Sequence, residues 1–465
     1  MKTRKLLVSA AVMIMLIAAL CVTAFAAEIV ESGTCGEKLT WTLDSDGVLT
    51  ISGEGEMTSH PWWWYDGENN IVYVGTVKEA VINEGVTSIT DNAFRSCASL
   101  TNVILPNTMT TIEDWAFVHC TSLTDITIPD SVTTIGRDAF SVCTSLTGIY
   151  VGENNPNYSS DSFGVLLNKT QSEIIKVPGA IAEYAIPNTV TTIGEDAFGD
   201  CTSLTNVTIP DSVTTIEQWA FAGCESLTGV IIPDGVTSID WGTFQGCISL
   251  TNVTIPDSVT TIADHAFSDC TSLTDITIPD SVTEIGQGAF SRCESLTSVT
   301  IPDSVTSLGV GAFVGCSSLT SVTLSNSMTA ISDNTFISCK SLTSVTIPDG
   351  ITVIGDLAFE GCESLTDIYY EGSEKQWNEI DIGSANEPLT NATIHYNYTP
   401  AHPAGDVDGD GKVENSDLVT IARYIVGLTE IDISTAVEAY ADMNGDGKVD
   451  NQDIVTVARV IVGLE

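Results

Sequence analysis

The chain has 465 residues, with 61 acidic against 16 basic side chains and a formal net charge of −45. A chain of this length has room for several domains. Such a negative field repels nucleic acid and anionic membrane surfaces, so we expect neither as a partner. The same field favours solubility and the binding of cations.

The N-terminal segment, residues 1–26, has the pattern of a secretory signal peptide. Basic residues precede an apolar run over residues 6–22, and a small-x-small site ends at Ala26. We expect cleavage after Ala26 and a secreted, extracellular protein that belongs to a cell-surface complex. The alternatives are an uncleaved membrane anchor and a lipoprotein at Cys21, for which Leu20 is too large. No other segment is apolar enough to span a bilayer.

Residues 27–80 are expected to form an N-terminal β cap. Residues 39–51 alternate apolar and polar side chains on either side of Asp46-Gly47. This pattern is typical of a β-hairpin.

A regular repeat fills residues 81–396. Its clearest mark is a recurring phenylalanine, at Phe94, Phe117, Phe140, Phe198, Phe221, Phe244, Phe267, Phe290, Phe313, Phe336 and Phe359. The ordinary step is 117 − 94 = 23 positions, and a fixed period in the twenties indicates a solenoid. The one long step, 198 − 140 = 58 positions, is one repeat plus 35. We expect the additional residues to form a hairpin insert near 150–186.

Within each unit the apolar residues follow a strand pattern. Leu123, Ile126 and Ile128 fit the L-x-x-L-x-L frame and are expected to point inward, while the residues between them point outward. Ile135 and Phe140 would complete the core from the return segment. No single coil would be stable alone.

The repeated motifs resemble those of a known family. Ile-Pro-Asp-Ser-Val-Thr, Ile-Gly-x-x-Ala-Phe and Cys-x-Ser-Leu-Thr recur through residues 81–396, and this region is similar to the BspA-like (treponemal-type) leucine-rich repeats. The resemblance implies a β-rich leucine-rich-repeat solenoid of short strands joined by turns or short helices, with a C-terminal cap at 369–396. Its members are secreted or surface-attached bacterial proteins, generally non-catalytic and associated with adhesion.

Two acidic loops near the C-terminus have the spacing of calcium-binding loops. Oxygen-bearing side chains occupy positions 1, 3, 5, 9 and 12, with Gly at position 6 and a lysine carbonyl at position 7. Hard oxygen donors at these positions suit Ca²⁺, so we predict two ions; the alternative is a pair of acidic turns. The predicted ligands are Asp406, Asp408, Asp410, Lys412, Glu414 and Asp417 in one loop, and Asp442, Asn444, Asp446, Lys448, Asp450 and Asp453 in the other.

The loops and the apolar segments after them form a duplication, with an offset of 442 − 406 = 36 positions. Residues 405–465, which follow a short linker at 397–404, resemble a type I dockerin. The resemblance implies a small all-α module that docks through calcium-dependent contacts onto a cohesin domain of a scaffoldin. The implied contact residues are Asn415, Ser416, Ala422, Arg423, Asn451, Gln452, Ala458 and Arg459. The usual Ser-Thr pair is absent from both loops, which leaves the cohesin class and the docking orientation open.

Eleven of the thirteen cysteines lie three residues after a repeat phenylalanine: Cys97, Cys120, Cys143, Cys201, Cys224, Cys247, Cys270, Cys293, Cys316, Cys339 and Cys362. In a secreted protein they could form disulfides. Equivalent positions of stacked coils lie side by side, however, and an odd number cannot all pair. We therefore favour a ladder of buried thiols.

Two surface features have competing interpretations. A file of threonines at the outward strand position could bind ice or a repetitive polymer, or could simply be a solvated β face; its members are Thr127, Thr208, Thr254, Thr277, Thr300, Thr323 and Thr346. The aromatic run from Trp62 to Tyr65 could stack on a glycan or pack the cap over the first coil. Trp115 and Trp219 occupy equivalent repeat positions, and Trp241 lies near in register.

Catalysis is not expected. The five histidines show neither metal-ligand spacing nor a Ser/His/Asp arrangement. The sequence favours a secreted, non-catalytic binding subunit, whose solenoid binds an unknown protein or glycan and whose dockerin anchors it to a cellulosome-like, polysaccharide-degrading complex. The alternatives are a surface-displayed adhesin that binds a protein of a host or neighbouring cell and, less favoured, a glycoside hydrolase.

Overall fold

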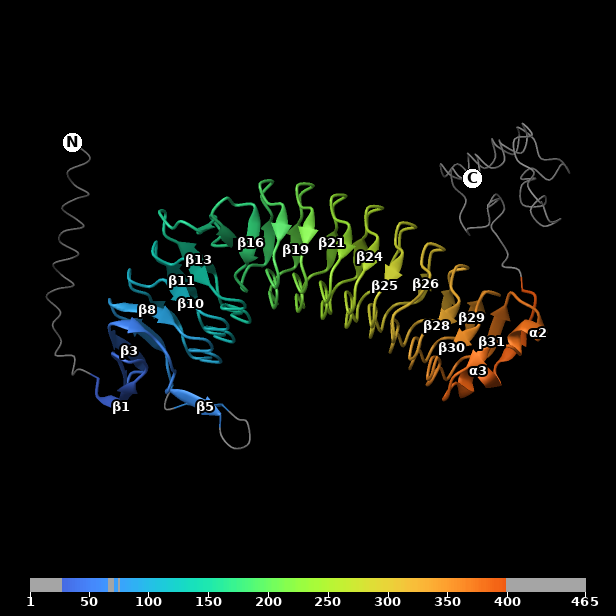
Figure 1. The fold of residues 1–465 in the computed structure, drawn as a ribbon, viewed down its shortest axis with the longest axis horizontal. Coiled ribbons are helices and arrows are strands. Elements are labelled where there is room, and N and C mark those ends of the chain that lie inside the picture. The colour runs from blue at the N-terminus through green and yellow to red at the C-terminus, as the bar shows by residue number, and fades with distance from the viewer. Residues whose placement is uncertain (1–26, 66–70, 74–75, 399–465) are drawn as a thin grey trace. The chain divides into compact units, whose positions relative to one another are not determined.

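The computed structural model describes residues 27–65, 71–73 and 76–398 (Figure 1). The chain divides into two units, residues 1–396 and 397–465. The first is a solenoid whose coils lie side by side in chain order (Figure 1). The predicted leucine-rich-repeat architecture is confirmed.

An antiparallel sheet begins the solenoid. β1 (Ile29–Thr34) pairs with β2 (Leu39–Asp44), and β2 pairs with β3 (Val48–Gly53). The turn between β2 and β3 contains Gly47 at φ +89°, a conformation that glycine adopts without strain. β3 then pairs in parallel with β7 (Glu79–Ile82), so the last strand of the hairpin is the template for the first coil. Between β4 (Gly55–Glu56) and β7, the chain forms a second antiparallel hairpin, in which β5 (Trp63–Tyr65) pairs with β6 (Ile71–Tyr73).

Most regular coils contribute one strand to a first series of parallel pairs, whereas residues 275–278 of one coil form no strand. The register shift between neighbouring coils is one repeat, as in Val299 beside Val322. The strands on this side of the coils are β9 (Asn102–Ile104), β11 (Asp125–Ile128), β13 (Gly148–Val151), β17 (Glu183–Ala185), β19 (Asn206–Thr208), β21 (Gly229–Ile231), β23 (Asn252–Thr254), β26 (Ser298–Thr300), β27 (Ser321–Thr323), β29 (Ser344–Ile347), β31 (Asp367–Tyr370) and β33 (Thr393–His395).

Most coils contribute a shorter strand to a second series of parallel pairs, and one coil joins it only through the isolated bridge of Leu308 with Ile285. Thr111 lies beside Thr134, again one repeat away. These strands are β4 (Gly55–Glu56), β8 (Val86–Ile89), β10 (Thr111–Ile112), β12 (Thr134–Ile135), β16 (Glu173–Lys176), β18 (Thr192–Ile193), β20 (Thr215–Ile216), β22 (Ser238–Ile239), β24 (Thr261–Ile262), β25 (Glu284–Ile285), β28 (Ala330–Ile331), β30 (Val353–Ile354) and β32 (Asp381–Ile382).

The strand alternation places side chains as predicted. Leu123, Ile126 and Ile128 are at most 1% exposed, whereas the residues between them face solvent. Phe140 is buried from the return side, and Ile135 is half-buried. Proline follows directly after β11, and because proline has no N–H to donate, the ladder ends there.

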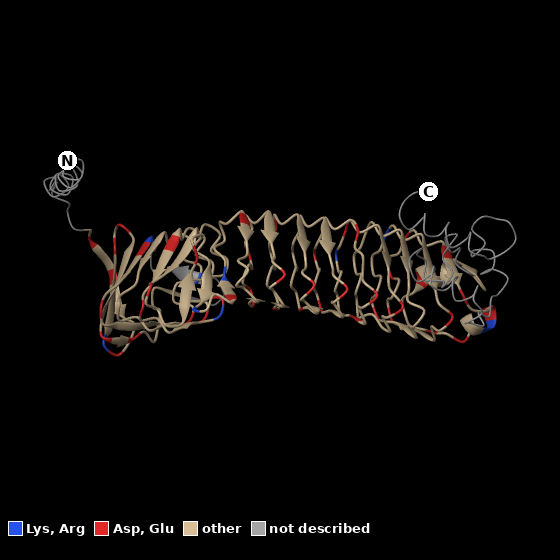
Figure 2. Cartoon of the chain, turned by 90° about the horizontal axis from the view of Figure 1, so that it is seen from above, with Lys and Arg blue, Asp and Glu red and all other residues tan. Residues whose placement is uncertain are grey.

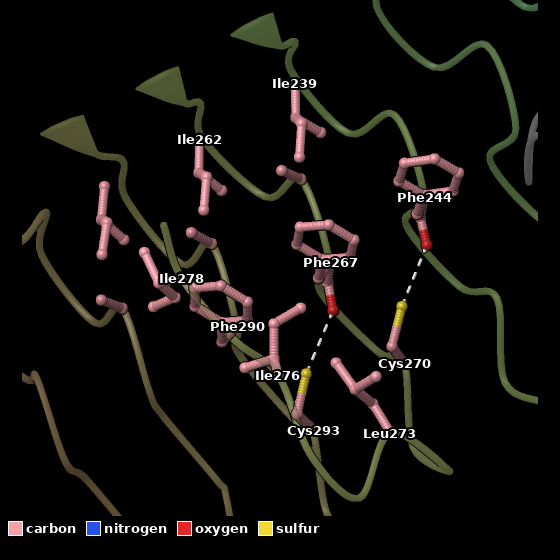
Figure 3. Close-up of a cluster of buried hydrophobic side chains, with 14 of the residues drawn as sticks. Ile239, Phe244, Ile262, Phe267, Cys270, Leu273, Ile276, Ile278, Phe290 and Cys293 are labelled. Atoms are coloured by element: carbon pink, nitrogen blue, oxygen red, sulfur yellow. Dashed lines mark hydrogen bonds between the residues drawn. The ribbon is translucent and has the colours of Figure 1, made fainter. Parts of the chain in front are cut away.

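The repeat phenylalanines stack along the core (Figure 3). The ring centroids of Phe244 and Phe267 lie 5.4 Å apart with an interplanar angle of 7°. Beside this stack, the Cys270 thiol donates to the Phe244 carbonyl at 3.1 Å, and the Cys293 thiol donates to the Phe267 carbonyl at 3.3 Å. On each side of the insert, the stack and the thiol bonds therefore join neighbouring coils.

The twelve cysteines of the described residues are free and buried. This agrees with the predicted thiol ladder rather than with disulfides. Burial raises the pKa of the Cys247 thiol to about 12. The thiolate form of Cys247 is thus disfavoured, and this cysteine acts as apolar filler with a weak donor.

The insert breaks the second series of parallel pairs. β14 (Tyr158–Ser160) pairs antiparallel with β15 (Leu166–Asn168), which pairs antiparallel with β16. β16 then resumes the parallel ladder with β18. The gap between β12 and β16 is bridged in part by the Tyr158 hydroxyl, which accepts from the Ile135 N–H at 3.0 Å.

Two short helices close the C-terminal end of the solenoid. α2 (Glu374–Trp377) begins with a capping box in which Ser373 and Gln376 bond each other's backbone N–H. α3 (Glu387–Asn391) follows β32. The buried Trp377 ring contacts Tyr370 edge-on at 5.1 Å, so the apolar core ends beneath these helices.

Candidate functional site

The predicted calcium loops, 406–417 and 442–453, lie outside the described residues. The same holds for every predicted cohesin-contact residue between Asn415 and Arg459. These assignments therefore stay predictions.

The aromatic run at residues 62–65 is in part a packing element. Trp62 and Trp63 are 0% and 4% exposed. The indole N–H of Trp62 donates to the Ala93 carbonyl at 2.7 Å, and its ring stacks against Phe94 at 5.6 Å. Rings buried in this way cannot stack on a glycan, so for Trp62 and Trp63 the cap-packing alternative is correct.

The outward threonine file is interrupted. Exposed Ile104, Tyr150 and Ile231 stand among its members, as does Ala185 of β17, which the sequence pattern did not reveal. The file is continuous only from Thr254 to Thr346. This is the pattern of a solvated β face rather than of a uniform hydroxyl surface.

A buried ion pair lies where the insert rejoins the coils. The Lys176 side chain, 9% exposed, places Nζ 2.6 Å from Asp196 Oδ2. It also donates to the carbonyls of Asp196 and Gly199, at 2.7 and 3.1 Å, and contacts Ser141 Oγ at 3.2 Å. The Ser141 hydroxyl donates to the same Asp196 carboxylate.

This Ser-Lys-Asp cluster is not equipped for nucleophilic catalysis. Burial alone would lower the pKa of Lys176, but the surrounding negative charge, led by the Asp196 carboxylate, and the hydrogen bond to Asp196 together raise it. A charged lysine cannot take the proton of Ser141. The adjoining cavity of about 30 Å³ has room for little more than a water molecule. The cluster joins the insert to the coils; sequence reasoning missed it because its three residues are far apart in the chain.

Trp115 lies in the turn that precedes a repeat phenylalanine, on what we call the turn side of the coils, and it contacts the cationic side chain of Arg137. The guanidinium carbon of Arg137 lies 5.5 Å from the centroid of a Trp115 ring. The Trp115 indole N–H donates to Asp138 Oδ2 at 3.2 Å. An open groove of about 320 Å³ lies beside Trp115, and its lining includes the acidic residues Asp91, Glu113 and Asp114.

Further along the turn side, three aromatic residues from successive coils form what we call the aromatic ridge: Trp219, Trp241 and His265. The centroids of Trp219 and Trp241 lie 4.4 Å apart, and those of Trp241 and His265 lie 6.2 Å apart. Trp241 is 39% exposed. The sequence pattern had placed the two tryptophans near each other in register but had assigned them no role, and it had not included His265.

Carboxylates accompany the ridge, and lysine and arginine are absent from this part of the sequence. Residues 177–291 contain fifteen Asp and Glu and no Lys or Arg. Figure 2 shows acidic residues on successive coils, with few basic ones. The ridge is therefore an exposed aromatic surface in a negative field.

Within the described part of the chain, no group of three or more His, Cys, Asp or Glu side chains could hold a metal ion. No helix there has the length and hydropathy needed to cross a bilayer.

The fold defines the class of protein. Its coils are stacked, each coil is one sequence repeat, and leucine and isoleucine side chains of the strands point inward, so this is a leucine-rich-repeat solenoid protein. The chain belongs to the BspA type leucine rich repeat family, whose six-copy model matches residues 68–181, 179–296 and 260–380. The dockerin type I domain model matches residues 404–461. Members of both families are typically non-catalytic, dockerins of this type bind calcium, and the match implies a cohesin partner.

Several solved structures are similar to this chain. A leucine-rich repeat protein from Eubacterium ventriosum is 28% identical, with 72% of this chain and 95% of the other covered and a TM-score of 0.48. One from Bacteroides ovatus is 24% identical, covering 78% and 98%, with a TM-score of 0.47. The T. pallidum leucine rich repeat protein is 29% identical, covering 45% and 86%, with a TM-score of 0.32. No curated protein matches the chain.

Proposed function

We propose that this protein is a secreted, non-catalytic binding subunit. Its solenoid recognises a ligand, and residues 405–465 fix it through calcium-dependent docking to a cohesin of a scaffoldin in a polysaccharide-degrading complex. The observation that carries this proposal is the dockerin type I match at residues 404–461, which contains both acidic loops. Residues 1–26 would direct export.

The donor chemistry of the loops fits calcium. Each loop offers carboxylate or amide oxygens at positions 1, 3, 5, 9 and 12 and a backbone carbonyl at position 7, and all of these are hard donors. Asp406, Asp408 and Asp410 would hold one ion with Asp417, and Asp442, Asn444 and Asp446 would hold the second with Asp453. Bound calcium would offset the repulsion among these carboxylates, so folding of the module is coupled to the metal.

The docking face follows from the duplication. Asn415, Ser416 and Arg423 in the first half correspond to Asn451, Gln452 and Arg459 in the second. The two halves differ at Ser416 and Gln452. Each half therefore offers a similar but distinct surface to cohesin.

The proposal is tested by calorimetric titration of the full chain with calcium and then with a panel of type I cohesins. We expect two bound ions and a tight cohesin complex that chelator dissociates. Replacing Asp417 and Asp453 with alanine removes both closing ligands and should abolish docking.

The control replaces Asp234 and Asp257 with alanine. Both are exposed turn residues of the solenoid, and the change in charge is the same. Docking should be unaffected. If the chain binds no calcium, the anchoring role is wrong.

A further inference from the structure

Two tryptophans at the same repeat position, Trp115 and Trp219, have different neighbours. A guanidinium group lies beside Trp115, and an indole ring lies beside Trp219. Trp115 and Trp219 lie at equivalent repeat positions, and both have φ +54°. The side chain that meets each ring comes from the same position of the following coil, which is Arg137 for Trp115 and Trp241 for Trp219. The Trp115 case shows that a guanidinium group can lie over a tryptophan ring at this position of the solenoid.

No cationic side chain of the neighbouring coils contacts Trp219. The sequence from 177 to 291 contains no Lys or Arg, so no lysine or arginine of the adjacent coils can cover the ring. No hydrogen bond joins the indole N–H of Trp219 or Trp241 to any other residue of the described ranges. The ridge thus has ring surface available to solvent, with carboxylates of Glu217, Asp240 and Asp264 on the same coils.

Two glycines give the rings the space they occupy. A β-carbon on Gly242 would lie 2.6 Å from Cδ1 of Trp219, and a β-carbon on Gly288 would lie 2.7 Å from Nδ1 of His265. Both glycines have positive φ, at +60° and +58°. Trp219 and His265 therefore rest directly on the backbone of the following coil, which fixes their orientation.

We propose that the aromatic ridge binds an Arg or Lys side chain of a basic polypeptide segment on a partner protein. The proposal deepens the binding role proposed for the solenoid and names the chemistry of its partner. A guanidinium or ammonium group over an indole face is attracted by the ring quadrupole, and nearby carboxylates add to the attraction. The internal Arg137–Trp115 contact shows that the coil geometry accommodates this arrangement.

The test is calorimetric titration of the full chain with hexa-arginine, with cellohexaose as a neutral glycan probe. About 0.15 M salt limits diffuse attraction to a Debye length of about 8 Å. Trp219→Ala should weaken hexa-arginine binding by roughly three- to tenfold, as expected for one cation–π contact. Trp241→Arg places an internal guanidinium where Arg137 lies in the other coil pair, and it should weaken binding at least as much.

Tyr150→Ala is the control, because Tyr150 is an exposed ring on the strand face away from the ridge. Its binding should equal that of the wild type. Equal affinity in all variants would mean that the acidic surface binds the peptide diffusely and would overturn the proposal. Binding of cellohexaose in place of hexa-arginine, or of neither probe, would also overturn it. Cohesin docking is measured separately, so either proposal can fail without the other.

Discussion

Lys176 shows how one buried side chain joins irregular and regular parts of the solenoid. Its ammonium group interacts with the carboxylates of Asp138, Asp196 and Asp200, so one positive charge faces three acidic side chains. Burial, followed by the charge of Asp196, raises the pKa of both Asp138 and Asp200, and Lys176 opposes this increase. Lys176 therefore stabilises the cluster, whereas repulsion among the three carboxylates destabilises it.

Lys176→Met should strongly destabilise the coils around the insert. Removing the cation leaves the Asp196 carboxylate without its partner, which costs about 3–5 kcal/mol for a buried pair. Hydrogen exchange at the amides of Val177 and Phe198 measures this local loss. The control is Lys340→Met at an exposed site. Unchanged protection at both amides would show that the pair contributes little.

The pair should also respond to alkali. Because the pKa of Lys176 is raised above its ordinary 10.5, its contribution is complete at neutral pH and is lost only as the pH rises through the folded-state pKa.

Asp200→Asn should stabilise the protein at neutral pH. Burial raises the pKa of Asp200, so the native state binds this proton more tightly than the unfolded chain does. The penalty of the ionised form is present at pH 7 and disappears as the pH falls through the folded-state pKa. Asparagine tolerates the left-handed backbone at this position, where φ is +57°. We expect a higher Tm at pH 7 and a difference that shrinks towards pH 4; a lower Tm at pH 7 would contradict this explanation.

At the scale of elements, the insert interrupts the regular coils and also connects the two parts of the solenoid on either side of it. The buried core forms two clusters, one ending and the other beginning around Val165 and Leu166 of the insert. Asn155 fastens the start of the hairpin: its amide nitrogen donates to the carbonyls of Pro129 and Val132 at 3.0 and 2.8 Å. Its side-chain oxygen accepts from the backbone N–H groups of Asn157 and Tyr158. Every hydrogen-bonding atom of a fully buried side chain is thus used.

Asn155→Asp should detach the hairpin from the preceding coil. A carboxylate oxygen would replace the amide nitrogen and face two carbonyl oxygens, at a cost of about 3 kcal/mol or more for a buried charge. Limited proteolysis between residues 152 and 172 and exchange of the Tyr158 amide report this loss. Asn252→Asp, at an exposed strand residue, is the control. Equal cleavage of the two variants would mean that Asn155 does not hold the hairpin.

At the scale of the whole molecule, the chain divides into two units, which we expect to differ in what stabilises them. The solenoid depends on apolar stacking between neighbouring coils, as in the Phe267 and Phe290 rings at 5.4 Å. The C-terminal unit matches a family whose members bind calcium, and we propose that its fold depends on the metal. The two should respond independently to chelation.

Chelator should therefore unfold residues 405–465 and leave the solenoid intact. No cluster of metal-binding side chains lies among the described solenoid residues, so removal of calcium takes no ligand from its core. Limited proteolysis with and without chelator, followed by mass spectrometry, should release the C-terminal module in fragments while residues 27–396 persist. Adding calcium back should restore protection. A C-terminal module that resists cleavage in chelator would contradict the coupling of folding to metal.

Periodicity explains how much of this fold could be predicted. One repeat step returns the chain to the same place on the next coil, so the inward positions of Leu123 and Ile126, the phenylalanine stack and the thiol ladder follow from spacing alone. For these features the sequence by itself was sufficient. The calcium loops are also predicted from local spacing, because the donors of each loop lie close together in the chain, and they stay a prediction.

Where the period breaks, only the tertiary structure decided the contacts. The insert brings Lys176 to Ser141 and Asp196, 35 and 20 residues away, along a path that no repeat defines. The cap buries Trp63 against Asn92, and this contact decides between the two interpretations that the sequence left open for the aromatic run. The difference between Trp115, covered by Arg137, and Trp219, beside Trp241, depends on which side chain of the neighbouring coil reaches the ring. Spacing determines which coil a residue joins, whereas side-chain direction and packing determine what it touches.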